Sequence, residues 1–119
     1  MRPFDRASKT PVAHTVGAGL IVLLAYGSAQ AGDVQAGRAK VQSLCGNCHG
    51  LDGLSKIPEA PNLAGQTEDY IMAQLNAFRS GERTNPMMTI VSKGLSDTDI
   101  ENVAAYYAAI PITVGKPPE

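Results

Sequence analysis

The chain has 119 residues, of which 44% are hydrophobic and 18% are charged, and its formal net charge is −1. This length suits one domain with a short appendage and is too small for two independent cores. The near-zero charge argues against nucleic acid as a partner, because a duplex-binding face needs an excess of lysine and arginine. Two cysteines are too few for a disulfide scaffold.

Residues 1–31 have the pattern of a secretory signal peptide. Arg2, Arg6 and Lys9 precede an uncharged stretch over residues 16–25, and a small-residue A-x-A sequence ends at Ala31. The apolar stretch is shorter than the ~20 residues that a membrane-spanning helix needs. An uncleaved anchor is the alternative to a cleaved signal.

Cleavage after Ala31 predicts one exported, periplasmic domain over residues 32–119, with no membrane span. This part keeps seven basic and ten acidic residues, and its one histidine is His49. A domain of this size is marginally stable without disulfides, a metal or another fixed group. We therefore expect a bound group to complete its core.

Two helices are predicted in the first part of this domain. The first runs from about Val34 to Cys48. The second begins after Thr67, whose side chain suits the N-cap position, and stops at Gly81. Three of its apolar residues share one face, namely Ile71, Leu75 and Phe78.

A third helix follows Ser96, which stands three residues before Asp99 in a capping-box pattern, and Pro111 marks its end. Its apolar stripe consists of Ile100, Val103, Tyr107 and Ile110. No segment alternates with period two, so the sequence predicts an all-α fold. Long irregular stretches over residues 50–65 and 82–94 separate the helices, and a large, flat, apolar ligand would give them a surface to pack on.

The segment from Cys45 to His49 reads C-x-x-C-H, the attachment signature of c-type haem. Cysteines at i and i+3 of a helix lie on one face, so both sulfurs can bond to the vinyl groups of one porphyrin. The adjacent histidine would then reach the iron as the proximal ligand. We therefore expect thioether bonds from Cys45 and Cys48 and axial ligation by His49.

Two other roles for the cysteine pair fit the sequence less well. A redox disulfide of the thioredoxin kind wants a βαβ context, which the sequence lacks. A structural zinc site needs four ligands, whereas the exported part offers two cysteines and one histidine.

Methionine is the usual strong-field partner of histidine in such proteins. Met72 lies inside the second predicted helix, where a core-filling role is favoured. Met87 and Met88 lie in the second long irregular stretch, and spacing alone does not separate them.

The sequence resembles a class I c-type cytochrome, of the small bacterial group called cytochrome c-553 and the domains of cytochrome c4. The resemblance covers residues 32–110. It rests on an ordered series of matches, namely Gly37, Cys45–Gly50, Ala60–Gln66, Tyr70, Gln74, Leu75, Phe78, Gly81, Arg83, Met87, Met88, Leu95–Asp97 and Ala104–Tyr107.

The resemblance implies roles for single residues. The carbonyl of Pro61 would accept a hydrogen bond from Nδ1 of His49, and Leu63 would pack against the haem face. Gly37 would let the first helix cross close to the last one, opposite Tyr106. The iron-binding methionine would be Met88, with Met87 as the reserve candidate.

The resemblance also implies a small class I cytochrome c fold, with three main helices and long loops around one covalently bound haem c. The expected function is that of a periplasmic electron carrier that cycles between Fe(II) and Fe(III) with histidine and methionine ligation, and not that of an enzyme. Its partners would be redox protein donors and acceptors, and it would be monomeric or weakly associating. Two alternatives are a haem-bearing subunit of a larger periplasmic oxidoreductase and a ligand-binding or peroxidatic haem protein.

Overall fold

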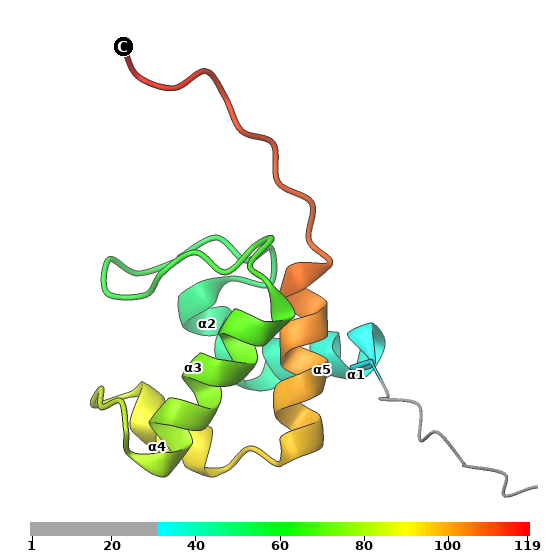
Figure 1. The fold of residues 1–119 in the computed structure, drawn as a ribbon, viewed down its shortest axis with the longest axis vertical. Helices are drawn as coiled ribbons and strands as arrows, with labels where there is room; N and C mark the ends of the chain where they lie inside the picture. The colour runs from blue at the N-terminus through cyan, green and yellow to red at the C-terminus, as the bar shows by residue number, and fades with distance from the viewer. Residues whose placement is uncertain (1–30) are drawn as a thin grey trace, which may run out of the picture.

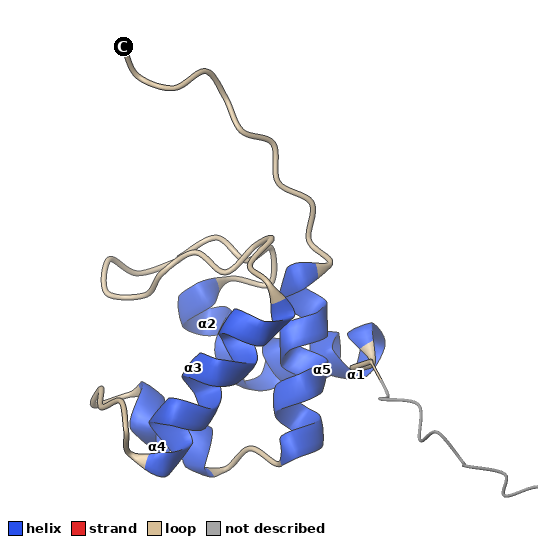
Figure 2. Cartoon of the chain, in the orientation of Figure 1, coloured by secondary structure: helices blue, strands red, loops and turns tan. Residues whose placement is uncertain are grey.

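A computed structural model describes residues 31–119, and within this range the chain is helical with no strand, as predicted (Figures 1 and 2). All but the last residue of the predicted signal peptide lie outside the described residues. The elements in chain order are α1 (Val34–Lys40), η1 (Val41–Cys45), α2 (Gly46–His49), α3 (Glu68–Ser80), α4 (Met88–Lys93) and α5 (Asp97–Ala108). No helix of the described range has the length and hydropathy that crossing a membrane requires.

The ends of α3 and α5 follow the predicted local signals. The Thr67 hydroxyl accepts the Tyr70 N–H at 3.4 Å, and α3 stops at Gly81. At the start of α5, the Ser96 hydroxyl accepts the Asp99 N–H at 3.1 Å while the Asp99 carboxylate accepts the Ser96 N–H at 3.0 Å. This reciprocal pair satisfies two helix-end donors, which confirms the capping box.

The first helix is not one continuous α-helix from Val34 to Cys48, as the sequence predicted. Its middle, η1, is a π-helical turn, in which the Gly46 N–H bonds back to the Val41 carbonyl. A Cβ placed on Gly46 would lie only 3.2 Å from that carbonyl oxygen, so a residue without a side chain fits here. Cys45 is the last residue of this wide turn, and no residue pattern in the sequence predicts the turn.

The second predicted irregular stretch, residues 82–94, contains the short helix α4, which the sequence did not predict. Six residues are too few for a clear hydrophobic period, and such a helix is unstable alone. In the fold its inner face packs on α3, where Ser92 and the following Leu95 are buried. Tertiary packing therefore decides that this segment is helical.

The core lies where α5 packs against α1 and α3 (Figure 1). The predicted stripes of α3 and α5 are confirmed, because their apolar residues are buried, with Ile110 partly buried at the end. The central cluster consists of Val41, Ile71, Leu75, Leu95, Ile100, Val103, Ala104 and Tyr107. Met72 packs against this cluster from α3, as predicted for a core-filling side chain.

The crossing of α1 over α5 is close because α1 presents Gly37 at the contact. A Cβ on Gly37 would lie 2.0 Å from the Asn102 carbonyl oxygen and 2.9 Å from the Tyr106 Cβ, so no larger residue fits without moving a helix backbone. An ion pair of 3.0 Å between Lys40 and Asp99 links the same two helices. The prediction that Gly37 allows the first helix to approach the last is confirmed.

Tyr107 of α5 holds both ends of the loop that spans residues 50–65. Its hydroxyl donates to the Gly50 carbonyl at 3.2 Å, and its own carbonyl accepts the Gly65 N–H at 2.9 Å. The neighbouring Tyr106 hydroxyl donates to the Leu51 carbonyl at 2.6 Å. Because Tyr107 is fully buried, the loop begins and ends at a fixed point of the core.

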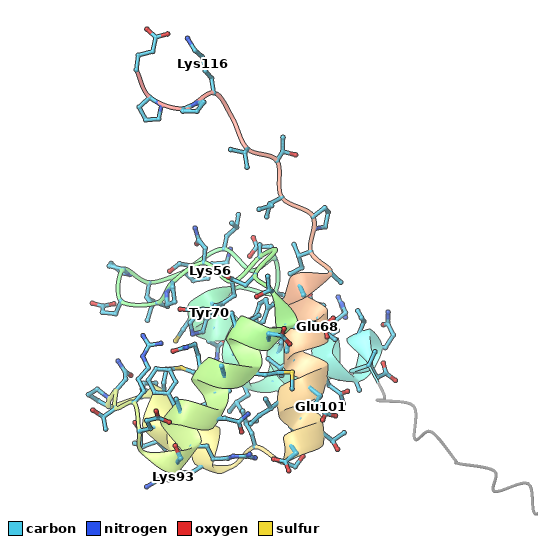
Figure 3. All side chains as sticks on the ribbon, in the orientation of Figure 1. Lys56, Glu68, Tyr70, Lys93, Glu101 and Lys116 are labelled. Atoms are coloured by element: carbon cyan, nitrogen blue, oxygen red, sulfur yellow. The ribbon has the colours of Figure 1, made fainter. Side chains whose placement is uncertain are left out.

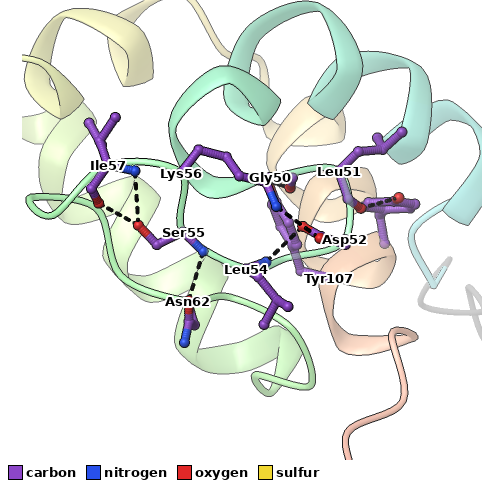
Figure 4. A network of polar contacts seen from close by, with 10 residues as sticks. Gly50, Leu51, Asp52, Leu54, Ser55, Lys56, Ile57, Asn62 and Tyr107 are labelled. Carbon is purple, nitrogen blue, oxygen red and sulfur yellow. Dashed lines mark hydrogen bonds and ion pairs between the residues drawn. The ribbon is translucent and has the colours of Figure 1, made fainter.

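Hydrogen bonds inside this loop give it a defined shape (Figure 4). The Gly53 carbonyl accepts the N–H groups of Leu63 at 2.8 Å and Ala64 at 3.0 Å, which joins the two arms of the loop. Between them, the Ser55 N–H donates to the Asn62 side chain at 2.7 Å. The loop is therefore an ordered part of the fold, and it holds residue 61 in a set position.

A larger residue at the crossing of α1 and α5 should destabilise the protein. Gly37→Ala is expected to cost about 2–3 kcal/mol, because the new methyl group meets helix backbone instead of a flexible side chain. Urea unfolding followed by circular dichroism measures the loss. Gly94→Ala is the control: its Cβ would meet only the Val91 carbonyl at 3.7 Å, so stability should stay level or rise by up to about 1 kcal/mol. Equal effects of the two substitutions would contradict this account of Gly37.

Removal of the Tyr107 hydroxyl should loosen the start of the loop. Tyr107→Phe keeps the ring in the core but leaves the buried Gly50 carbonyl without this donor, which is expected to cost about 1–2 kcal/mol. Thermal and urea unfolding measure the change. Tyr70→Phe is the matched control, because Tyr70 is 47% exposed, and its substitution should change stability by less than about 0.5 kcal/mol.

Candidate functional site

The C-x-x-C-H motif lies at the junction of η1 and α2. Cys45 is the last residue of η1, while Cys48 and His49 belong to the single turn of α2, which ends at Gly50. Both cysteines are partly buried and are not joined in a disulfide. The turn is fixed from outside by the Lys56 N–H, which donates to the Cys48 carbonyl at 2.8 Å.

His49 is buried, with 7% of its surface exposed, and one of its ring nitrogens has a defined partner. Nδ1 lies 2.9 Å from the Pro61 carbonyl oxygen. A carbonyl oxygen only accepts hydrogen bonds, so Nδ1 carries the proton in this contact. In the neutral ring this tautomer leaves the lone pair on Nε2, which is the form in which an imidazole binds a metal.

The environment of Cys45 does not suit a redox-active thiol. Burial raises the pKa of the Cys45 thiol to about 11, against a smaller opposing effect of the Lys40 ammonium. Reactive cysteines of the C-x-x-C type have lowered pKa values, because the thiolate is the nucleophile. The raised pKa and the helical surroundings both argue against the thioredoxin-like alternative.

The two neighbouring methionines occupy different environments. Met88, the first residue of α4, is partly buried and packs against the central cluster that Cys45 also contacts. Met87 is 61% exposed. Leu63, at the end of the loop, is partly buried against the same cluster. Cys45, Leu63 and Met88 therefore all pack against the same core cluster, whereas Met87 lies on the surface.

This arrangement fits a covalently attached haem. The thiols stand three residues apart on the chain, beside a buried imidazole whose Nε2 is free to bind iron. A partly buried thioether and a leucine from two other segments pack on the same cluster. Across residues 31–119, no three histidine, cysteine, aspartate or glutamate side chains come close enough to hold a metal ion by themselves. Cys45, Cys48, His49 and Met88 could hold haem c, whose iron exchanges one electron.

Sequence reasoning missed three residues that shape this site. The hydroxyls of Tyr106 and Tyr107 hold the residues directly after His49, and Asn85 caps the turn that carries Met88. The tyrosines gave no local signal, since their partners lie 55 and 57 residues away in the chain. Asn85 did carry a local signal, because an asparagine followed by a proline, here Pro86, is typical of a helix start.

Two arginines that could have faced the site have other partners. Arg79 donates to the Leu95 carbonyl at 3.0 Å and pairs with Asp97 at 2.5 Å, so it fastens α3 to the start of α5. The Arg83 guanidinium bonds to the Gln74 side chain and lies 4.6 Å from the centre of the Phe78 ring. Both therefore act in the packing of α3.

Lysines are dispersed over the described surface. Figure 3 places Lys56 on the loop, Lys93 at the end of α4 and Lys116 on the C-terminal segment, all on separate parts of the molecule. Residues 32–119 also carry more acidic than basic residues, ten against seven.

Comparisons with known proteins show which family the chain belongs to. Residues 32–106 match the family model described as cytochrome C oxidase, cbb3-type, subunit III. Cytochrome c4 of Pseudomonas aeruginosa is 46% identical over 85 residues, which cover 71% of this chain and 42% of that protein. Cytochrome c-554(548) of Halomonas halodenitrificans is 43% identical over 82 residues, which cover 66% of this chain and 98% of that protein.

The fold agrees as well. The crystal structure of reduced recombinant cytochrome c4 from Pseudomonas stutzeri matches with a TM-score of 0.63 and 41% identity, over 71% of this chain and 49% of that one. The chain therefore spans under half the length of the cytochrome c4 relatives, and nearly the whole length of the smaller cytochrome. With one C-x-x-C-H motif and this fold, the chain belongs to the class I c-type cytochrome family, whose cofactor is covalently bound haem c.

Proposed function

We propose that the protein is a monohaem electron carrier of the periplasm. The observation that carries the proposal is the buried His49 imidazole, which follows two thiols and has Nδ1 bonded to the Pro61 carbonyl. Cys45 and Cys48 are the thioether attachment points in this proposal, and His49 is the proximal ligand. The haem supplies reversible one-electron exchange at iron, so no substrate bond has to be made or broken.

The His49–Pro61 contact has a chemical role in this proposal. A hydrogen bond from Nδ1 fixes the ring tautomer and orientation, and it makes Nε2 a better donor to iron. The imidazole itself is buried, so most of its ring is shielded from water. Leu63, two residues after Pro61, supplies an apolar side chain that packs against the core cluster.

Met88 is the proposed second axial ligand. Its partial burial against the cluster that Cys45 contacts supports it over Met87, which is mainly exposed. A thioether ligand favours the ferrous state and so raises the reduction potential. With His49 and Met88 both holding the iron, no position would remain for a small ligand, which would suit a carrier better than a ligand-binding or peroxidatic protein.

Export through cleavage after Ala31 is part of the same proposal. Gly32 already packs on α5, since a Cβ on it would lie 2.2 Å from the Glu101 carbonyl oxygen, and the family match starts at the same residue. These observations support a mature domain that begins at Gly32. The N-terminal sequence of the protein purified from the periplasm tests this boundary.

Expression in a host that matures c-type cytochromes tests the function. We expect a coloured periplasmic protein with both thiols blocked, which takes up and releases one electron reversibly with small redox mediators. A colourless product with both thiols free would overturn the proposal. Redox protein donors and acceptors are the proposed partners. Size-exclusion chromatography of the native periplasmic fraction distinguishes two cases, a free carrier that is monomeric or weakly associating and a subunit of a larger oxidoreductase.

The choice between the two methionines is testable by substitution. Met88→Ala should open the iron to carbon monoxide, abolish the weak red absorption band of methionine-ligated ferric haem and lower the midpoint potential. Met87→Ala is the matched control and should leave all three unchanged, because Met87 is exposed. The opposite pattern would assign the ligand to Met87, and no effect of either substitution would exclude both.

A further inference from the structure

Four hydrogen bonds converge on the turn that precedes α4. The Asn85 side-chain oxygen accepts the N–H groups of Met87 and Met88, each at 3.0 Å. The Asn85 N–H donates to the Thr89 hydroxyl at 3.0 Å, and the Thr89 N–H donates to the Asn85 carbonyl at 3.0 Å. Asn85 and Thr89 therefore close this turn from both sides, with the two methionines between them.

These bonds make Asn85 the helix cap in physical terms. The bond from the Thr89 N–H to the Asn85 carbonyl spans four residues, so helical hydrogen bonding begins at Asn85, although regular helix begins at Met88. Asparagine is among the best N-cap residues, and proline, here Pro86, suits the next position. The cap binds the N–H of Met88 directly.

The cap matters more here than in a long helix. The regular part of α4 has six residues, and its outer face is solvated, with Ile90 72% exposed. A segment with few buried contacts and exposed backbone bonds opens locally at low cost. Loss of one cap then removes a large share of what holds the turn closed.

We propose that Asn85 is a positioning residue for Met88: its side-chain oxygen holds the methionine-bearing turn closed and so sets how often the thioether leaves the axial position. The proposal rests on the proposed assignment of Met88 as the axial ligand. It predicts that Asn85 controls the access of small ligands to the iron without touching the haem itself.

The test measures the rate at which the reduced holoprotein binds carbon monoxide at saturating concentration, where methionine dissociation limits the rate. Asn85→Ala should raise this rate about fivefold, the equivalent of about 1 kcal/mol for a lost cap. Asn85→Asp keeps the acceptor oxygen and should restore the rate of the unaltered protein. Thr89→Val removes the hydroxyl that accepts the Asn85 N–H and should raise the rate to a smaller extent.

The chain contains a matched control for loss of a cap. The Asp33 carboxylate caps α1 in the same way, accepting the Gln35 N–H at 2.7 Å and the Ala36 N–H at 3.1 Å. Asp33→Ala should lower the unfolding midpoint, followed by circular dichroism, and leave the carbon monoxide rate unchanged. A structural role alone would make Asn85→Ala behave like Asp33→Ala.

The outcomes separate this inference from the assignment beneath it. If Met88→Ala abolishes the red band of the ferric protein but Asn85→Ala leaves the binding rate unchanged, Asn85 has no positioning role and the ligand assignment stands. If Met88→Ala leaves that band intact, both are overturned. A raised rate in Asn85→Ala that Asn85→Asp does not restore would also contradict the proposal, since the acceptor oxygen is then not what matters.

Discussion

The hydrogen bond from Nδ1 of His49 to the Pro61 carbonyl is the contact on which the site depends. It joins two segments whose bonded residues are twelve positions apart, the turn that carries the C-x-x-C-H motif and the far arm of the loop. Pro61 lies on the surface, so packing in the core does not hold it in place. The loop that carries it must therefore be held at other points. The support comes from Tyr107, which bonds to Gly50 at one end of the loop and Gly65 at the other.

Helix α5 contacts both α1 and α3 as well as the loop. Its backbone at Asn102 lies close to Gly37 of α1. Its last turn carries the two tyrosines that bond to the loop. Burial raises the pKa of Tyr107 above its ordinary value, so its hydroxyl stays protonated and able to donate. The crossing with α1 and the bonds to the loop are therefore both made by α5. A substitution that displaces α5 should affect helix packing and site geometry together.

The two sides of the proposed haem site are held with unequal strength. On the histidine side, the imidazole and Tyr107 are buried, and buried hydrogen bonds are costly to break. On the methionine side, a six-residue helix and an exposed asparagine cap hold Met88. Local opening is cheaper on that side. Of the two proposed ligands, Met88 is accordingly the one expected to exchange first.

The sequence by itself determined the features that depend on neighbouring residues. These features are the helix caps at Thr67 and Ser96, the stripes of α3 and α5 and the C-x-x-C-H motif. Each depends on residues a few positions apart, so the order of residues is enough to predict it. Family resemblance added Pro61 and the preference for Met88. Only the tertiary structure decided the π-helical turn before Cys45, the helical state of α4 and the tyrosine bonds to the loop. Each of these depends on packing between segments far apart in the chain, and no local pattern encodes which distant backbone a side chain will meet.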